Sequence, residues 1–448
     1  MKRQFFGTDG VRGEYGSALM NEALAWRLGA GAARLAKTRP GLKATRVFIG
    51  RDTRASGVAL EHALSAGLLA EGLQPVSLGI VPTPAVSLLT RREGAAFGVV
   101  ITASHNPARD NGIKFFGANG IKLTDEDEAR LEMLMPAEAG LAPSQRPLQA
   151  DGLKHYLEAT TALLPENSLA GWKVVLDAAH GAAWRSSRTV LEKLGADLSL
   201  IGTEPDGANI NAGVGSQHPE AMCARVKQTG ARLGIAHDGD ADRCVLCDEH
   251  GDVLDGDELL AILALHALRQ GQLVTNTLVA TVQSNLGLDA AVTAAGGRVV
   301  RTAVGDRYVI ERMLADGATL GGESSGHVIC AEVSPTGDGL VAALKIIEVM
   351  LATGRPLSEL RRGMKKFPQL SAALAVQEKK TLETLPTLNA TMAALAAELG
   401  ARGRVLVRYS GTEPKLRLLV EGETDAQVKR CLDRLLAAAR ADLAVIGD

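Results

Sequence analysis

Short apolar runs alternate along this chain with longer segments in which apolar residues recur every three or four positions. The first pattern predicts buried β-strands and the second predicts amphipathic helices. In the first part of the chain, the predicted strands are 46–50, 75–78 and 96–101, and the predicted helices are 56–71 and 84–92. Because strands and helices alternate, this part predicts a parallel α/β sheet.

The same alternation returns twice further along the chain. The second unit has predicted strands at 172–176, 197–201 and 232–236, with helices at 182–194 and 219–229. The third has predicted strands at 277–282, 298–303 and 318–321, with helices at 257–269, 285–295 and 306–316. The last part differs, because two strand-like runs, 405–408 and 416–420, frame a loop before a closing helix from 425 onward.

This pattern predicts an α/β protein with three similar α/β domains, mixed and mainly parallel sheets, and a smaller C-terminal α+β domain. The seams fall at a proline-containing stretch over 140–150, at the turn near 255–256, and at 366–369. The predicted domains are therefore 1–150, 151–255, 256–368 and 369–448.

The composition restricts the partners of the chain. Its 448 residues are 46% hydrophobic, carry a net charge of -2, and include only 3% aromatic side chains. A balanced charge and few aromatic rings argue against nucleic acid and an anionic membrane. No apolar run approaches a membrane span, and the start lacks the apolar core of a signal peptide. The five cysteines are scattered, which suits a reducing compartment, so we expect a cytoplasmic protein.

Three aspartates alternate through the segment 237–243, which separates two short apolar runs. The carboxylates of Asp238, Asp240 and Asp242 would repel one another unless a hard divalent cation holds them together, and Mg²⁺ is the leading candidate. An EF-hand is excluded, because Arg243 stands where that loop needs glycine and the flanking runs predict strands. The alternative is a solvated acidic turn. Arg243 favours the metal site, because its guanidinium suits a phosphate that also contacts the cation.

The segment 102–107 follows the predicted strand 96–101, at the edge where open α/β sheets bind ligands. Its Ser104 precedes an Asn-Pro turn that should expose the hydroxyl at this edge, as a nucleophile or as a turn-capping group. The chain has no GxSxG motif, so phosphoryl transfer near the aspartates fits this serine better than acyl transfer. Lys114, on one arm of a predicted hairpin, either snorkels to solvent or faces Ser104.

The segment 321–327 combines an acid, two hydroxyls and an imidazole after the predicted strand 318–321. Glu323 and Ser325 can bond to neighbouring sugar hydroxyls, and His327 titrates near neutral pH and could move protons. A structural role for the histidine is the alternative.

The loop 408–417 has arginines at both ends and hydroxyls around a glycine. Backbone amides, hydroxyls and guanidinium groups together suit a phosphate dianion. The candidate phosphate-binding residues are Arg408, Ser410, Gly411, Thr412 and Arg417. Alternatively, these are charges at the edge of a hairpin. The chain has no Walker A motif, so nucleotide binding of that kind is not indicated.

Five segments, in chain order, resemble the motifs of the α-D-phosphohexomutase superfamily; they are 6–13, 102–107, 238–243, 322–327 and 408–417. The resemblance implies four domains around a central cleft and a phosphoserine at Ser104. It also implies one Mg²⁺ per subunit, with a ligand set made of Asp238, Asp240, Asp242 and an oxygen of phosphorylated Ser104.

The same resemblance assigns roles around two phosphates. The groups around the reacting phosphate would be Arg12, His105, Lys114, Arg243 and His327. Glu323 and Ser325 would bind sugar hydroxyls, and the loop 408–417 would grip the phosphate that is not reacting. The chain departs from the superfamily at Ala241, where glycine is frequent. We expect metal binding to survive and the turn to avoid backbone angles that only glycine takes easily.

The resemblance further implies an isomerase that moves a phosphoryl group between O6 and O1 of a hexose through phospho-Ser104 and a bisphosphate intermediate. The branch it resembles acts on glucosamine phosphates and supplies UDP-N-acetylglucosamine synthesis. Two alternatives stay open: a mutase for mannose or glucose phosphates, and a phosphosugar-binding protein without turnover. Expected cofactors are Mg²⁺, phosphorylation of Ser104, and glucosamine or glucose 1,6-bisphosphate as activator. The expected partner is a small phosphosugar, with neither nucleic acid nor membrane; a homodimer is left open.

Overall fold

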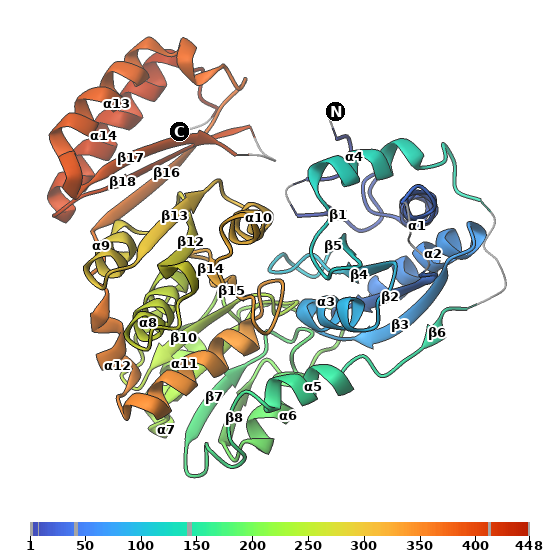
Figure 1. The fold of residues 1–448 in the computed structure, drawn as a ribbon. Coiled ribbons are helices and arrows are strands. Elements are labelled where there is room, and N and C mark those ends of the chain that lie inside the picture. The colour runs from blue at the N-terminus through green and yellow to red at the C-terminus, as the bar shows by residue number, and fades with distance from the viewer. Residues whose placement is uncertain (1–2, 8, 40–43, 141–145, 411–413, 447–448) are drawn as a thin grey trace. The chain divides into compact units, whose positions relative to one another are not determined.

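The structure is a computed structural model that describes residues 3–7, 9–39, 44–140, 146–410 and 414–446 (Figure 1). The contacts among residues divide the chain into two compact units. The larger comprises Met1–Gln283 and Ala295–Gly363, and the smaller comprises Ser284–Ala294 and Met364–Asp448.

The first sheet of the larger unit forms from the apolar runs of the N-terminal part of the chain. Its strand order is β1 (Val11–Glu14), β5 (Asp110–Gly117), β4 (Phe97–Ile101), β2 (Arg46–Arg51), β3 (Gln74–Ile80) and β6 (Leu148–Gln149). β4, β2, β3 and β6 are parallel, whereas β5 runs antiparallel to β4 and β1. The accompanying helices are α1 (Glu22–Lys37), α2 (Gly57–Ala70), α3 (Thr83–Arg92) and α4 (Asp125–Leu134). α1 and α2 approach closely at Gly67, where a Cβ would stand 2.0 Å from the Trp26 carbonyl oxygen.

The second sheet follows the same design on a smaller scale. Its strand order is β11 (Val253–Leu254), β10 (Cys244–Asp248), β9 (Leu233–His237), β7 (Lys173–Asp177) and β8 (Asp197–Ile201). β9, β7 and β8 are parallel, and β10 returns antiparallel to β9. The helices of this part are α5 (Lys154–Thr161), α6 (Ser186–Lys193) and α7 (Glu220–Thr229). The turn between β9 and β10 is therefore a hairpin at the carboxyl end of a central parallel strand.

The third sheet completes the larger unit. Its strand order is β13 (Arg298–Thr302), β12 (Thr277–Thr281), β14 (Leu320–Gly322) and β15 (Val328–Cys330), with only the β14–β15 pair antiparallel. The α-helices are α8 (Gly256–Arg269), α10 (Asp306–Asp316), α11 (Gly339–Thr353) and α12 (Leu357–Leu360), and the 3-10 turns are η1 (Val274–Asn276) and η2 (Arg361–Gly363). α8 begins with a capping box in which Asp255 and Glu258 bond to each other's backbone N–H groups.

The smaller unit is an antiparallel sheet covered by helices. Its strand order is β16 (Gln369–Ala375), β18 (Lys415–Glu421) and β17 (Arg404–Tyr409). Its α-helices are α9 (Leu286–Ala294), α13 (Pro386–Leu399) and α14 (Asp425–Asp442), and its 3-10 turns are η3 (Leu382–Thr384) and η4 (Gly400–Arg402). The core buries one face of the sheet against α13 and α14; Leu388, Leu416, Val428 and Leu435 are fully buried.

The predicted α/β class, with mixed sheets and a smaller C-terminal α+β part, is confirmed. The helix predicted over 182–194 is shorter, because the chain makes turns before α6 begins at Ser186. The domain boundaries at 150, 255 and 368 stay predictions. None of the helices within the described ranges is long and apolar enough to cross a membrane. All five cysteines have free thiols.

Candidate active site

Two loops of the larger unit meet at the carboxyl ends of their sheets. The segment 102–107 leaves β4, and the segment 238–243 joins β9 to β10. The Ser104 hydroxyl donates to Asp238 Oδ2 at 2.5 Å, which joins the two loops through their polar side chains. The contact requires glycine at position 239, because a Cβ there would stand 2.5 Å from the Ser104 carbonyl oxygen. The structure thus brings the predicted nucleophile to the predicted metal ligands.

Ser104 is fully buried, with 0% of its surface exposed, so the expectation of an exposed turn at the sheet edge is wrong. The physical reason is a contact that the local sequence does not encode: Gly239 and Asn211 cover the turn. The serine also has a φ of +52°, in the left-handed region that costs about 1–2 kcal/mol for a residue with a Cβ. Such strain at a buried polar residue is frequent in functional sites.

The three aspartates are buried and could share a cation. One carboxylate oxygen from each of Asp238, Asp240 and Asp242 lies within 4.8 Å of the others. Oδ1 of Asp240 and Oδ1 of Asp242 are buried and have no hydrogen-bond partner among the described residues. Unsatisfied carboxylate oxygens that converge in this way fit a hard divalent cation, which prefers oxygen ligands. The alternative of a solvated turn is wrong, because none of the three side chains reaches solvent.

Ala241 adopts a conformation that the sequence did not predict. Its φ is +58°, so the expectation that the turn avoids glycine-like angles is wrong. The Ala241 N–H donates to the Asp238 carbonyl oxygen at 3.1 Å and its carbonyl oxygen accepts from Gly339 N at 3.0 Å. These two bonds hold the tight turn, and the small methyl group limits the steric cost.

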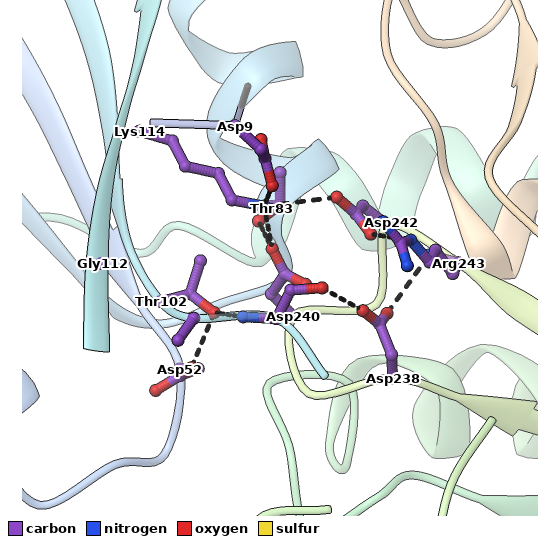
Figure 2. Close-up of polar contacts among 12 residues, drawn as sticks. Asp9, Asp52, Thr83, Thr102, Gly112, Lys114, Asp238, Asp240, Asp242 and Arg243 are labelled. Atoms are coloured by element: carbon purple, nitrogen blue, oxygen red, sulfur yellow. Dashed lines mark hydrogen bonds and ion pairs between the residues drawn. The ribbon is translucent and has the colours of Figure 1, made fainter. Parts of the chain in front are cut away.

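Lys114 provides positive charge inside the aspartate cluster (Figure 2). Its Nζ lies 3.0 Å from Asp240 Oδ2, 3.4 Å from Asp242 Oδ2 and 3.1 Å from Asp9 Oδ2. The side chain is 1% exposed, so the snorkelling alternative is wrong. Burial alone would lower the pKa of Lys114, but the three carboxylates raise it above its usual value, and the ammonium stays charged.

The carboxyl groups at the two ends of the aspartate loop, Asp238 and Asp242, have pKa values that are shifted in opposite directions. Burial together with Asp242 and Asp240 raises the pKa of Asp238 well above its usual range. Burial would also raise the pKa of Asp242, but Lys114, His327 and other cationic neighbours hold it well below its usual range. A divalent cation beside Asp238 would favour its ionised form, so the electrostatics agree with a metal site.

Three further predicted groups surround the serine. His105 Nδ1 lies 3.4 Å from Ser104 Oγ and 3.4 Å from Arg243 Nη1. Arg12 Nη1 donates to the Ala103 carbonyl oxygen at 3.2 Å. Burial, Arg243 and Arg12 lower the pKa of His105 to about 4, so the imidazole is neutral at neutral pH. The two guanidinium groups therefore supply the fixed positive charge on this side of Ser104.

The predicted sugar loop reaches the aspartates through its histidine. His327 Nδ1 lies 3.7 Å from Asp242 Oδ2, and Nε2 lies 3.5 Å from Asp306 Oδ2. Burial would lower the pKa of His327, but these carboxylates raise it. Glu323 Oε1 accepts from Gly305 N at 3.0 Å, and Ser325 Oγ is buried without a hydrogen-bond partner among the described residues.

Four polar residues of this site were not predicted from the sequence: Asp9, Thr83, Lys122 and Asp306. Thr83 Oγ1 donates to Asp240 Oδ2 at 2.6 Å, and Lys122 Nζ pairs with both Asp9 and Asp306. Asp9 lies inside the segment 6–13 that resembles a superfamily motif, and Thr83 lies just beyond the carboxyl end of β3. Both positions could therefore have been predicted as part of a site. No feature of the sequence distinguishes Lys122 and Asp306 from charged residues on the surface.

The predicted phosphate loop belongs to the smaller unit. Arg408 on β17 and Arg417 on β18 are direct cross-strand partners, and Ser410 N donates to the Lys415 carbonyl oxygen at 2.8 Å. The register therefore places the two arginines side by side on one face of the sheet, next to the start of the predicted loop. The predicted residues Gly411 and Thr412 lie outside the described residues.

Comparison with known proteins identifies the family. Residues 3–140, 154–251, 255–367 and 372–438 match domains I, II and III and the C-terminal domain of phosphoglucomutase/phosphomannomutase. A phosphoglucosamine mutase of Moorella thermoacetica is 48% identical over 97% of this chain and 99% of its own length. One from Halorhodospira halophila is 46% identical over 97% of this chain and 96% of its own length.

Solved structures agree with this assignment. A putative phosphomannomutase of Thermus thermophilus has a TM-score of 0.80 at 27% identity, covering 98% of this chain and 100% of that one. A phosphoglucomutase/phosphomannomutase family protein of Burkholderia thailandensis shares the fold, with a TM-score of 0.82 at 24% identity and 98% coverage of both chains. The chain belongs to the phosphoglucomutase/phosphomannomutase family of α-D-phosphohexomutases.

Proposed function

We propose that this chain is a phosphoglucosamine mutase, an isomerase that interconverts glucosamine 6-phosphate and glucosamine 1-phosphate. The observation that carries the proposal is the 2.5 Å contact between Ser104 Oγ and Asp238 within a buried cluster of three carboxylates. Lys114 Nζ and the Arg243 guanidinium lie beside this cluster and offer positive charge to a phosphoryl group. Several curated relatives, 44–48% identical over nearly the whole chain, are phosphoglucosamine mutases, which favours the amino sugar.

The proposed reaction consists of two phosphoryl transfers, each of a different phosphoryl group. The free hydroxyl of the substrate attacks the phosphorus of phospho-Ser104, the bond to Ser104 Oγ breaks, and glucosamine 1,6-bisphosphate forms. The intermediate turns in the site, and Ser104 Oγ then attacks its other phosphate and becomes phosphorylated again. Each transfer moves one proton from the attacking hydroxyl to the oxygen that leaves, so the protein ends each cycle as phospho-Ser104.

The residues fit a cation that assists this transfer. Mg²⁺ would be held by Asp238, Asp240, Asp242 and an oxygen of phospho-Ser104, and the two unsatisfied aspartate oxygens support this ligand set. When bound, the ion would neutralise negative charge on the phosphoryl group. We propose one Mg²⁺ per subunit and a hexose 1,6-bisphosphate as the activator that first loads Ser104.

The remaining groups have proposed roles in holding the substrate. Around the transferring phosphoryl group we place Arg12, His105, Lys114, Arg243 and His327. Glu323 and Ser325 would bond to sugar hydroxyls, and the buried, unsatisfied Ser325 Oγ supports a ligand there. The other phosphate would be held by Arg408, Ser410, Gly411, Thr412 and Arg417. The cytoplasmic location, the homodimer and the supply of UDP-N-acetylglucosamine synthesis stay predictions.

Substrate preference tests this proposal. With the 6-phosphates of glucosamine, glucose and mannose assayed side by side, kcat/KM is expected to be highest for glucosamine 6-phosphate, by about tenfold or more. The reason is that a site that bonds to the amine of the sugar loses those bonds with the other hexoses. Equal or faster turnover of the mannose or glucose compound would support the alternative mutase. Tight binding of all three without turnover would support a phosphosugar-binding protein.

If the loop 408–417 binds the phosphate that is not reacting, weakening this contact is expected to release more of the bisphosphate intermediate. Arg417→Ala should raise KM about 10- to 100-fold, the loss for a hydrogen bond to a charged group, while Ser104 still accepts phosphate from the bisphosphate. The bisphosphate must dissociate from this loop and rebind with its two phosphates exchanged. A weaker contact therefore makes its release into solution more frequent. KM and leaked glucosamine 1,6-bisphosphate are measured together.

The matched control is Arg402→Ala, which removes an exposed arginine of the same unit that pairs with Glu423. This control should leave both KM and leakage unchanged. The anchoring role would be contradicted if Arg417→Ala released no more bisphosphate than the wild type. It would also be contradicted if Ser104 of this variant no longer accepted phosphate from the bisphosphate.

A further inference from the structure

A buried arginine holds the loop that carries Ser104. Arg54 follows β2, and its guanidinium is fully buried. A guanidinium has five N–H donors, and here each has an acceptor. The acceptors are Asp52 Oδ2 for Nε at 2.9 Å and, for the terminal nitrogens, the carbonyl oxygens of Ser104, Asn106, Pro107 and Asp110. One side chain therefore binds four backbone oxygens of the segment on either side of the Asn-Pro turn.

The backbone N–H of Ser104 is held by the same group of residues. It donates to Thr102 Oγ1 at 2.9 Å, and this hydroxyl donates to Asp52 Oδ2 at 2.7 Å. Asp52 is in turn the ion-pair partner of Arg54 (Figure 2 shows the Asp52–Thr102 contact). Both polar backbone groups of Ser104 are thus connected to one buried ion pair.

A second side chain, from the loop between β8 and α7, also holds the segment that carries Ser104. Asn211 Nδ2 donates to the carbonyl oxygens of Ser104, at 2.9 Å, and Asn106, at 3.0 Å. These are the two oxygens that Arg54 Nη2 also contacts. The left-handed backbone of Ser104 persists because its N–H and its carbonyl oxygen are both bonded in this way.

We propose that Arg54 and Thr102 are positioning residues for phosphoryl transfer: they fix the Ser104 backbone in its left-handed conformation and so hold Ser104 Oγ against Asp238. This rests on the proposed role of Ser104 as the phosphoryl carrier. Both side chains bond to the backbone of Ser104 and not to its hydroxyl. Their contribution is the placement of the nucleophile, and a misplacement of about 1 Å can slow a reaction about a hundredfold.

Arg54→Lys tests this role, because lysine keeps the charge beside Asp52 but has only three donors on one nitrogen. The expected result is a fall in kcat of about tenfold to a hundredfold with KM within about twofold of wild type. The rate at which glucosamine 1,6-bisphosphate phosphorylates dephosphorylated Ser104 should fall by the same factor. Thermal unfolding and the folded fraction are measured on the same samples.

The matched control is Arg361→Lys. Arg361 donates to Glu258 at 2.8 Å, to Asp248 at 3.1 Å and to the Val253 carbonyl oxygen at 2.9 Å, away from Ser104. If Arg54 only stabilises the fold, both variants should lose stability and keep wild-type kcat per folded molecule, which would overturn the proposal. A loss of kcat restricted to Arg54→Lys supports it.

Thr102→Val gives a second test if Arg54→Lys does not fold. Valine has a similar shape but removes the acceptor of Ser104 N–H, so kcat should fall and KM should not, with recovery of most of the loss in Thr102→Ser. Wild-type transfer rates in Thr102→Val would overturn the proposal. If wild-type protein itself fails to take phosphate on Ser104, the proposed function fails instead, and the two failures are distinguished.

Discussion

Ser104→Ala is expected to lower the turnover of glucosamine 6-phosphate by at least about 10⁴-fold. Alanine has no oxygen to carry the phosphoryl group, and no other hydroxyl is bonded to Asp238 among the described residues. Because Ser104 is buried, removing its hydroxyl leaves Asp238 Oδ2 without this donor, and the free energy of unfolding should drop by about 1–3 kcal/mol. Steady-state kcat and a denaturant titration measure the two effects.

The matched control for this variant is Ser87→Ala. Ser87 is also fully buried, and its hydroxyl donates to the Gly120 carbonyl oxygen at 2.5 Å, outside the aspartate cluster. The control should lose a comparable amount of stability and retain its turnover. Substantial activity in Ser104→Ala would show that Ser104 does not carry the phosphoryl group.

Asp240→Asn is expected to weaken Mg²⁺ binding and to slow turnover by about 10²- to 10³-fold. The variant removes one negative ligand from a site that must hold a doubly charged ion. The amide also disturbs the protein contacts, because Asp240 Oδ2 accepts from both Thr83 Oγ1 and Lys114 Nζ. Calorimetric titration with Mg²⁺ gives the affinity, and assays with a chelator and with restored Mg²⁺ give the dependence of activity on the ion.

Asp248→Asn is the control for loss of a buried carboxylate. Asp248 lies on β10 in the same sheet as the aspartate loop, but it pairs with Arg361 and accepts from His250 N and Asp252 N. Its substitution should leave the Mg²⁺ affinity unchanged. Wild-type affinity in Asp240→Asn, or activity that is indifferent to chelator, would contradict the metal site.

The central strands of the fold could be predicted because their apolar runs reflect burial directly. β4 and β12 are of this kind, since every residue in them is buried. β1 could not be predicted, because its sequence Val-Arg-Gly-Glu has no strand pattern and it forms by pairing with β5, about a hundred residues away. α11 was missed for the opposite reason. It is apolar and buried on nearly all sides, so it lacks the amphipathic period that marks a surface helix.

The chemical groups of the site were predictable from motifs, but their environment was not. Spacing and residue type identified Ser104 and the three aspartates as candidates, and the structure brings them together. The burial of Ser104 depends on Gly239 and Asn211, which lie in loops that follow strands of the second sheet. The left-handed turn at Ala241 likewise depends on its bond to Gly339. Such contacts join distant parts of the chain, and local sequence does not encode them.

The role of Ser104 as the phosphoryl carrier is tested most directly by following the phosphoryl group itself. Dephosphorylated protein is incubated with Mg²⁺ and glucosamine 1,6-bisphosphate carrying radiolabelled phosphate, and the labelled peptide is mapped. Label is expected on Ser104 alone, and it should be transferred to the sugar when unlabelled glucosamine 6-phosphate is added. Label on another residue, or label on Ser104 that the sugar phosphate does not remove, would contradict the role of Ser104 as the phosphoryl carrier.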